Sequence, residues 1–408
     1  MNKNLVTAAL LGALTAPAMA GSVQLYGVID AGLTHFSGLA NGAGGTTTSS
    51  GLSSGVQSPS IIGIKGMEQL GPQFFALFDA ETGFCATGNN QDLTTAGKLN
   101  SGVAGPQAYC SANSGVSTGV GFMQSQAYVA LAGRFGMVAA GDGAPVIYRD
   151  EKLVDPFGGG MTGAITNLSL VSQFADLHQN QGVVYTTPNI RGFKAGVSYS
   201  FAPGAIGTIP SLSPATPMVH NVSRAEGAFA RYTAGPLTAG IAWAVNKDLP
   251  LPAMLNPVTH VNDGSLTGEQ IYGAYDFGAA KVAALYERAT VDYNAGADTF
   301  AMLGVTIPLG RNTLLASYGR TRIDQGMQHV NLLSASFTAP PVPIYGTATQ
   351  VALGWTYAFS KHTNLYASYS HIANDTHTMF AVGSASDGFL GAMGQSSTGY
   401  ALGLRHQF

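Results

Sequence analysis

Long apolar runs are absent from most of this 408-residue chain, because every such run beyond residue 20 is broken within a few residues by Gly, Ser, Asp or Lys. A membrane helix takes roughly 20 apolar residues, so helical spans are excluded. Charge is also scarce, at 10% of the residues. If Lys3 is left out with the first twenty residues, 17 basic and 21 acidic residues remain, so the net charge is 17 − 21 = −4. This balance excludes a polyanion-binding protein and gives no sign of nucleic-acid binding.

Typical catalytic patterns are missing as well. The sequence has no convincing nucleophile elbow, paired catalytic carboxylates in a turn, zinc-type His cluster or phosphate-cradling glycine loop. We therefore predict that the protein is not an enzyme and needs no cofactor. A secreted adhesin or β-rich enzyme is the competing class, and release into the medium instead of extraction with detergent would favour it.

The first twenty residues, MNKNLVTAALLGALTAPAMA, have the features of a secretory signal peptide: a basic Lys3, an apolar stretch over residues 5–14, and small residues at the end. We expect the mature chain to begin at Gly21 and to form one domain over residues 21–408. Export would place Cys85 and Cys110 in an oxidising compartment, where a disulfide within their Gly/Asn/Ser-rich loop is the simplest interpretation. Two thiols without neighbouring His leave a metal shell incomplete, so no metal is predicted.

Glycine and aromatic residues, in contrast, are abundant: Gly is 54, and Tyr and Phe together are 36 (17 plus 19). This composition favours many short strands, glycine-rich turns and aromatic girdles. It would also fit a β-solenoid, but the chain shows no fixed repeat length. Alternation and turn residues predict sixteen strands, over residues 22–36, 60–69, 72–84, 122–133, 134–141, 180–188, 191–202, 224–234, 236–246, 267–277, 279–290, 298–308, 311–324, 347–359, 362–375 and 397–408.

The connections between these strands alternate between very short and long. Seven tight turns alternate with eight longer loops, which is the pattern of an up-and-down meander with both termini on one side. Several strands also have one apolar face and one small or polar face, such as residues 193–201, 350–359 and 400–408. A strand in a closed membrane barrel needs this arrangement, because lipid contacts one face and water the other. We predict an all-β fold, a 16-stranded antiparallel transmembrane β-barrel with short periplasmic turns and long external loops.

Six segments resemble, in order, the general diffusion porins of β-proteobacteria, a trimeric porin family of Gram-negative outer membranes. They are residues 22–33 (SVQLYGVIDAGL), 63–71 (GIKGMEQLG), 126–131 (QAYVAL), 155–160 (DPFGGG), 184–189 (VYTTPN) and 402–408 (LGLRHQF). The resemblance implies a homotrimer in the outer membrane, a third loop folded into the lumen, and a second loop that contains Cys85 and Cys110 and latches onto a neighbouring subunit. It also implies outer-membrane lipid and lipopolysaccharide as partners, and recognition of Phe408 by the barrel assembly machinery.

The third long connection, about residues 142–179, is predicted to narrow the lumen, since its prolines and glycines forbid regular strand. Its charged residues are the candidates for the pore constriction, namely Asp142, Arg149, Asp150, Glu151, Lys152 and Asp155. Charges on the lipid side of a strand cost roughly 2 to 4 kcal/mol near the midplane, so inward positions are favoured, although strand ends escape this argument. The resulting pore-wall candidates are Lys65, Asp79, Glu81, Arg288, Arg320 and Arg322, the last being close to a strand end.

Two departures from the family concern selectivity. Many members carry arginine where this chain has Ile61 and Asp142. We therefore expect a water-filled channel for passive diffusion of small hydrophilic solutes and ions that is weakly cation-preferring or unselective. The alternative is a substrate-specific channel with a solute-binding lumen. A row of aromatic residues along the third loop would favour this alternative, but only Tyr148 and Phe157 are present there.

Overall fold

The computed structural model describes residues 22–41, 44–87, 126–143, 150–169, 171, 179–201, 224–249, 264–291, 296–324, 344–383 and 391–408. Within these ranges the chain forms one sheet of seventeen strands. They are β1 (Ser22–Ala40), β2 (Thr46–Ser54), β3 (Ile61–Gly71), β4 (Phe74–Gly83), β5 (Gln126–Gly133), β6 (Gly136–Gly143), β7 (Gln179–Thr186), β8 (Phe193–Ser200), β9 (Arg224–Ala234), β10 (Leu237–Leu249), β11 (Gly264–Asp276), β12 (Lys281–Val291), β13 (Ala297–Leu309), β14 (Asn312–Ile323), β15 (Gly346–Ala358), β16 (Thr363–Asn374) and β17 (Ser397–Gln407).

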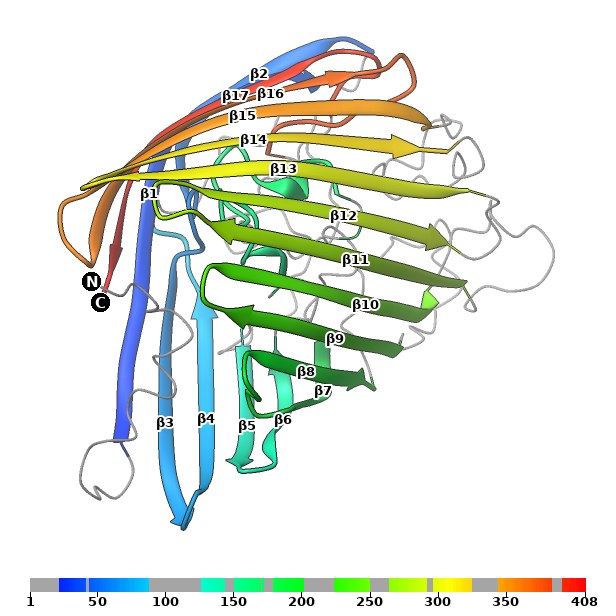
Figure 1. Ribbon diagram of the computed structural model, residues 1–408. Coiled ribbons are helices and arrows are strands. Elements are labelled where there is room, and N and C mark those ends of the chain that lie inside the picture. The colour runs from blue at the N-terminus through cyan, green and yellow to red at the C-terminus, as the bar shows by residue number, and fades with distance from the viewer. Residues whose placement is uncertain are drawn as a thin grey trace, which may run out of the picture.

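The sheet closes on itself. From β3 to β17 each strand pairs antiparallel with the next one along the chain, and β17 pairs back onto β1 (Figure 1). In that last ladder Val28 stands opposite Gln407 and Ser37 opposite Thr398. In the described ranges, the strands from β3 to β17 and β1 therefore each have a partner on both sides, as a lipid environment requires, whereas β2 pairs with β1 alone.

Sixteen strand positions surround the barrel, because β2 and β3 share one of them. The outer part of β1, from Ala31 to Ala40, pairs with β2, whereas the part from Ser22 to Val28 pairs with β3. The predicted sixteen-stranded antiparallel barrel is therefore confirmed. Strand β2 was not predicted, since its sequence TTTSSGLSS has almost no apolar alternation. Its pairing with β1, which extends past the predicted end at residue 36, forms it.

Alternation along the strands separates an apolar outer face from an inner face. On β8, Phe193 and Val197 are exposed, whereas Gly196 and Ser198 are buried. On β15, Val351 and Leu353 are exposed and Ala352 is buried. At the ends of β11 and β15 next to the short turns, rings lie in contact, with centroid distances of 4.6 Å for Tyr275–Phe277 and 5.1 Å for Tyr357–Phe359. Aromatic rings are favoured at a membrane–water interface.

The turns at that end of the barrel are as short as predicted. β9 and β10, β11 and β12, and β13 and β14 are each joined by a few residues. Gly235, Gly278 and Gly310 occupy these turns with positive φ angles of 57°, 84° and 66°, a conformation that glycine adopts without strain. In the described ranges, no helix combines the length and apolar character that crossing a bilayer requires.

Candidate functional site

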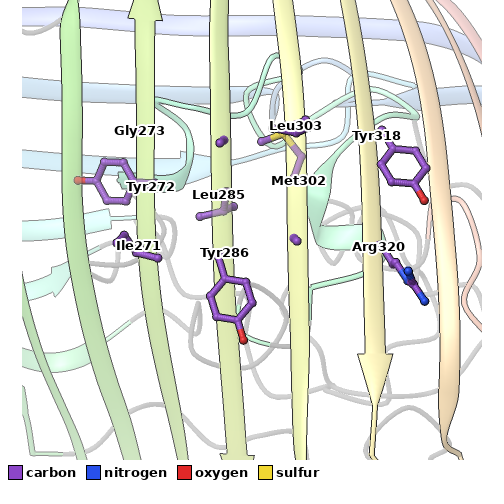
Figure 2. Close-up of a pocket in the computed structure, with 11 residues that line it drawn as sticks. Ile271, Tyr272, Gly273, Leu285, Tyr286, Met302, Leu303, Tyr318 and Arg320 are labelled. Carbon is purple, nitrogen blue, oxygen red and sulfur yellow. The ribbon is translucent and has the colours of Figure 1, made fainter.

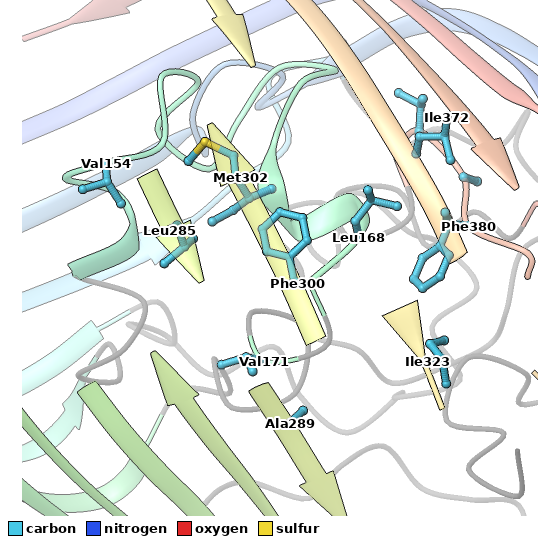
Figure 3. Packing of buried hydrophobic residues seen from close by; sticks show 14 of the residues in the cluster. Val154, Leu168, Val171, Leu285, Ala289, Phe300, Met302, Ile323, Ile372 and Phe380 are labelled. Carbon is cyan, nitrogen blue, oxygen red and sulfur yellow. The ribbon is translucent and has the colours of Figure 1, made fainter. Parts of the chain in front are cut away.

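Residues 150–169 and 171 follow β6 along the chain and lie inside the barrel, against the inner faces of β9 to β16 (Figure 1). We call this segment the inner loop. Its Val154, Leu168 and Val171 side chains are almost fully buried. Figure 3 shows them packed toward Leu285 of β12 and Phe300 of β13. The predicted inward fold of the third connection is confirmed. Burial of these side chains holds the inner loop to one wall, since each contributes up to about 1.5 to 3 kcal/mol.

The start of the inner loop is fixed by a charged contact. Asp150 is 1% exposed and forms a salt bridge with Arg231 of β9. The hydroxyl of Tyr272, on β11, donates to the other carboxylate oxygen at 2.6 Å. Burial raises the pKa of Asp150, while Tyr272 and Arg231 oppose this rise by stabilising the carboxylate. The Asp150 charge is thus compensated within the wall and anchors the inner loop.

The far end of the inner loop is fixed by a buried carboxylate of the wall. Ser169 donates its hydroxyl hydrogen to Glu287 of β12, and the Gln270 amide of β11 donates to the other oxygen at 2.7 Å. Glu287 is fully buried. Glu287 was not predicted from the sequence. Because Val282 and Tyr286 face outward, the residues that alternate with them along β12, including Glu287, could have been assigned to the inner face.

The middle of the inner loop is held by uncharged hydrogen bonds to β15 and β16. Ser368 accepts from the backbone N–H and the hydroxyl of Thr162, at 3.2 and 3.0 Å. The Asn167 amide donates to the side-chain oxygen of Gln350 at 3.0 Å, and the Gln350 amide donates to the carbonyl of Gly163 at 3.0 Å. These buried pairs fix the inner loop along the pore axis, because breaking one leaves a polar group without a partner.

A tight turn around Asp155 shapes the surface of the inner loop. The Asp155 carboxylate accepts from the backbone N–H groups of Phe157 at 2.9 Å and Gly159 at 2.8 Å. Burial raises the pKa of Asp155 to about 6, while these N–H groups and Lys152 oppose the rise. At Gly160, an added Cβ would lie 2.0 Å from the carbonyl oxygen of Gln57, so this close approach requires glycine.

The opposite side of the lumen carries charges of both signs. Tyr26 of β1 donates to Asp79 of β4 at 2.6 Å, and Gln126 of β5 donates to the same carboxylate at 3.2 Å. The ammonium of Lys65, on β3, lies 4.8 Å from the centre of the Tyr26 ring. Lys65 and Asp79 stand opposite one another in the ladder and share the inner face. Glu81, two residues along, interacts electrostatically with Lys152 of the inner loop. We call Lys65, Asp79 and Glu81 the charged wall.

Three predicted pore-wall residues lie elsewhere. Arg288, Arg320 and Arg322 share the outer face with the exposed Tyr286 and Tyr318, so the prediction of a lumen position was wrong. Each arginine is an even number of residues away from an outward-facing apolar side chain on the same strand, so it points outward as well. Figure 2 shows this for Arg320, which lies two residues beyond Tyr318 on the same face of β14. All three lie near strand ends. The free-energy cost of an arginine that faces lipid falls there to about 0 to 1 kcal/mol, so an outward orientation is tolerated.

Asp142 also differs from its predicted place. It lies within β6, opposite Ala127, and not in the inner loop. Gly141 has φ of 141°, and the pairing of β6 with β7 shifts between Gly141 and Gly143, so the alternation of faces along β6 is interrupted at Asp142.

Of the other predicted residues, Glu151 and Lys152 belong to the inner loop, where Glu151 is fully buried. Arg149 lies outside the described residues. Cys85 takes part in a disulfide, and Cys110, its expected partner, also lies outside the described residues. Phe408 follows β17, and its backbone N–H donates to Gly27 at 3.0 Å. The described ranges contain no cluster of His, Cys, Asp or Glu suited to a metal ion.

Comparison with known proteins fits a closed barrel with an inner loop. A sequence model of the Gram-negative porin family matches residues 7–377. The chain belongs to this family. This porin is 27% identical over 435 residues to an outer membrane porin of Bordetella pertussis, and 26% identical over 423 residues to outer membrane porin protein 32 of Delftia acidovorans. Both alignments cover the whole of each chain.

Solved structures show the same fold. The anion-selective porin from Comamonas acidovorans matches with a TM-score of 0.67 and 22% identity, over 95% of this chain and 100% of that one. The trimer form of OmpT from Vibrio cholerae matches with a TM-score of 0.61 and 14% identity, over 96% and 100%. This porin is accordingly a multi-pass β-barrel of the Gram-negative outer membrane and forms a channel.

Proposed function

We propose that this porin passes small hydrophilic solutes and ions by passive diffusion between the inner loop and the charged wall, with a weak preference for cations or none. The observation that carries this proposal is the distribution of charge. The arginines at 288, 320 and 322 point away from the lumen. Asp79 and Glu81 remain at the wall opposite the inner loop. Within the charged wall, two carboxylates therefore accompany the single ammonium group of Lys65, and the inward-facing Arg231 is paired with Asp150, an arrangement that does not favour anions.

The anion-selective Comamonas porin is the relevant contrast, because it has the same fold. In this porin Ile61 and Asp142 stand where many family members carry arginine. Ile61 contributes no charge to the inner face of β3, so the potential at this point of the lumen is less positive than arginine would make it.

Reversal potentials in a salt gradient test this proposal. We expect potassium to be slightly more permeant than chloride, or equally permeant. The double variant Asp79→Asn/Glu81→Gln should shift the preference toward chloride, since it removes two negative charges from the wall. The matched control is Glu68→Gln on the neighbouring strand β3. It removes an exposed charge from the outer face of the barrel and should leave the reversal potential unchanged. Clear chloride preference of the unaltered porin would contradict the proposal, and saturable block by one solute would indicate a substrate-specific channel instead.

The partners and processing follow from the same family. We propose that three copies assemble, as the trimer form of the Vibrio OmpT fold suggests, that the protein has no enzymatic activity, and that it contacts outer-membrane lipid and lipopolysaccharide. We also propose that the barrel assembly machinery recognises Phe408, a residue that is 46% exposed. Removal of residues 1–20 would leave one barrel domain beginning at Gly21, which N-terminal sequencing of the purified protein would test. Cross-linking in detergent would show whether three chains associate.

A further inference from the structure

Between β2 and β3 the chain turns into the lumen, over residues 55–60. We call this segment the inward turn. Asp30 of β1 shows its direction, because Asp30 is fully buried and follows the outward-facing Ile29, so its side chain points inward. The Asp30 carboxylate accepts hydrogen bonds from the backbone N–H groups of Gln57 at 2.6 Å and Ser58 at 2.7 Å. The inward turn therefore lies on the inner side of β1.

Strands from the end of the chain hold the inward turn as well. The hydroxyl of Tyr366, on β16, donates to the second carboxylate oxygen of Asp30 at 2.6 Å. Arg405 of β17 donates to the Ser58 hydroxyl at 2.7 Å and stands opposite Asp30 in the ladder. The negative charge of Asp30 thus faces a positive charge, and hydrogen bonds to a charged acceptor are roughly twice as strong as those between neutral groups. The inward turn is therefore fixed where the barrel closes.

The inward turn also contacts the middle of the inner loop. The backbone N–H of Met161 donates to the carbonyl of Val56 at 2.5 Å. At Gly160 the chain passes so close to the inward turn that an added Cβ would lie 2.0 Å from the carbonyl oxygen of Gln57. Behind this contact, Phe157 and Met161 pack with buried residues of β14, β15 and β16. The inner loop and the inward turn therefore form one continuous barrier from these strands to β1.

We infer that the inward turn is a second element of the pore constriction, and that Asp30 is the positioning residue that holds it in the lumen. This inference rests on the proposed function, since both place the path of solutes along the charged wall. The inward turn ends at Ser60, directly before Ile61 on the inner face of β3. Lys65 lies on the same face four residues further along, at about 13 Å. Residues 56–59 are half-buried and uncharged, so the inward turn narrows this path by its volume and not by its charge.

A cysteine placed on the inward turn tests its position. In Gln57→Cys the backbone N–H that Asp30 accepts is kept, so the inward turn should stay in place. The purified full-length porin in a planar bilayer is treated with methanethiosulfonate ethylsulfonate. This reagent transfers its sulfur-bearing anionic group to the thiolate, so that a disulfide forms and methanesulfinate leaves. We expect a stepwise loss of open-channel current. Thr48→Cys, at an exposed position of β2, and the unaltered porin should show no loss, and mass spectrometry counts the adducts.

Two substitutions of Asp30 test its role as a positioning residue. Asp30→Asn keeps an oxygen for the two backbone N–H groups and places its amide N–H groups against the Tyr366 hydroxyl, which can accept as well as donate. Asp30→Ala removes the same negative charge together with all of these hydrogen bonds. We expect Asp30→Ala to raise the open-channel conductance and to admit larger polyethylene glycols, whereas Asp30→Asn keeps the exclusion limit of the unaltered porin. Because both variants change the charge equally, a difference in exclusion limit reports the loss of the anchor.

Unchanged current after labelling of Gln57→Cys would overturn the inference, since the inward turn would then lie outside the path of the solutes. An equal exclusion limit in Asp30→Ala and Asp30→Asn refutes the role of Asp30. If Asp30→Ala does not assemble, Tyr366→Phe takes its place, because it removes one hydrogen bond from the Asp30 carboxylate and should widen the pore by a smaller amount. Failure of the proposed function is distinguishable, because the unaltered porin would then form no channel or prefer chloride, whereas the labelling result concerns the inward turn alone.

Discussion

The anchor of the inner loop at Asp150 gives a quantitative prediction. In Arg231→Ala, the buried Asp150 carboxylate loses its salt-bridge partner and keeps the hydrogen bond from Tyr272 and the electrostatic interaction with Lys194. Leaving a buried charge without its partner costs about 3 to 5 kcal/mol. Tyr272→Phe removes one hydrogen bond to a charged group and should cost less, about 1.5 to 3 kcal/mol. The remaining contacts of the inner loop stay intact, so we expect its first residues to detach while the barrel remains closed.

Single-channel recording measures this detachment. Arg231→Ala should show larger open-channel current fluctuations than the unaltered porin, Tyr272→Phe a smaller increase, and Arg134→Ala, which changes an exposed arginine in the β5–β6 turn, no increase. Neutralising the orphaned charge should reverse the effect, so the double variant Asp150→Asn/Arg231→Ala should be quieter than Arg231→Ala alone. If the double variant fluctuates as much as the single one, the burial of an unpaired charge is not the cause, and the reasoning is refuted.

Two further predictions concern the surface of the inner loop. Gly160→Ala places a Cβ 2.0 Å from the Gln57 carbonyl and should lower the free energy of unfolding by about 1 to 3 kcal/mol, whereas Gly71→Ala, with open space around it, should not; thermal unfolding in detergent distinguishes them. The pKa of Asp155 is raised to about 6, above its unfolded value. Its contribution to stability is therefore fully present below about pH 4 and lost by about pH 6, a change of about 3 kcal/mol that Asp155→Asn should abolish. A pH-independent difference between Asp155→Asn and the unaltered porin would contradict this assignment.

Most of the barrel could be predicted from local patterns. The alternation of side chains in segments such as residues 193–201 and 350–359 shows which face of the strand is apolar. The tight turns show where the chain reverses direction. Strand β2 could not be predicted in this way, because Thr46–Ser54 has little side-chain contrast. Its hydrogen bonds to β1, and not its own side chains, make it a strand.

The candidate site was predicted only in part. Lys65, Asp79 and Glu81 lie on the inner face, because they alternate along their strands with outward-facing residues such as Ile64. The arginines were assigned to the wrong face, because Arg288 and Arg320, like Arg322, lie close enough to the strand ends for a charge in lipid to cost little. Tyr286, which shares its parity with Arg288, carried the correct signal.

The sequence by itself determined the closed barrel, since a repeated period of two with polar and apolar faces has few other ways to satisfy its backbone in lipid. It also indicated that the third long connection, about residues 142–179, leaves the regular sheet, through Pro145, Pro156 and the glycines at 158–160. Only the tertiary structure decided which charges face each other. Asp150 meets Arg231 81 residues further along, and Ser169 meets Glu287 118 residues further along. Such pairs depend on how the inner loop lies across distant strands, and no local pattern in the chain encodes that distance.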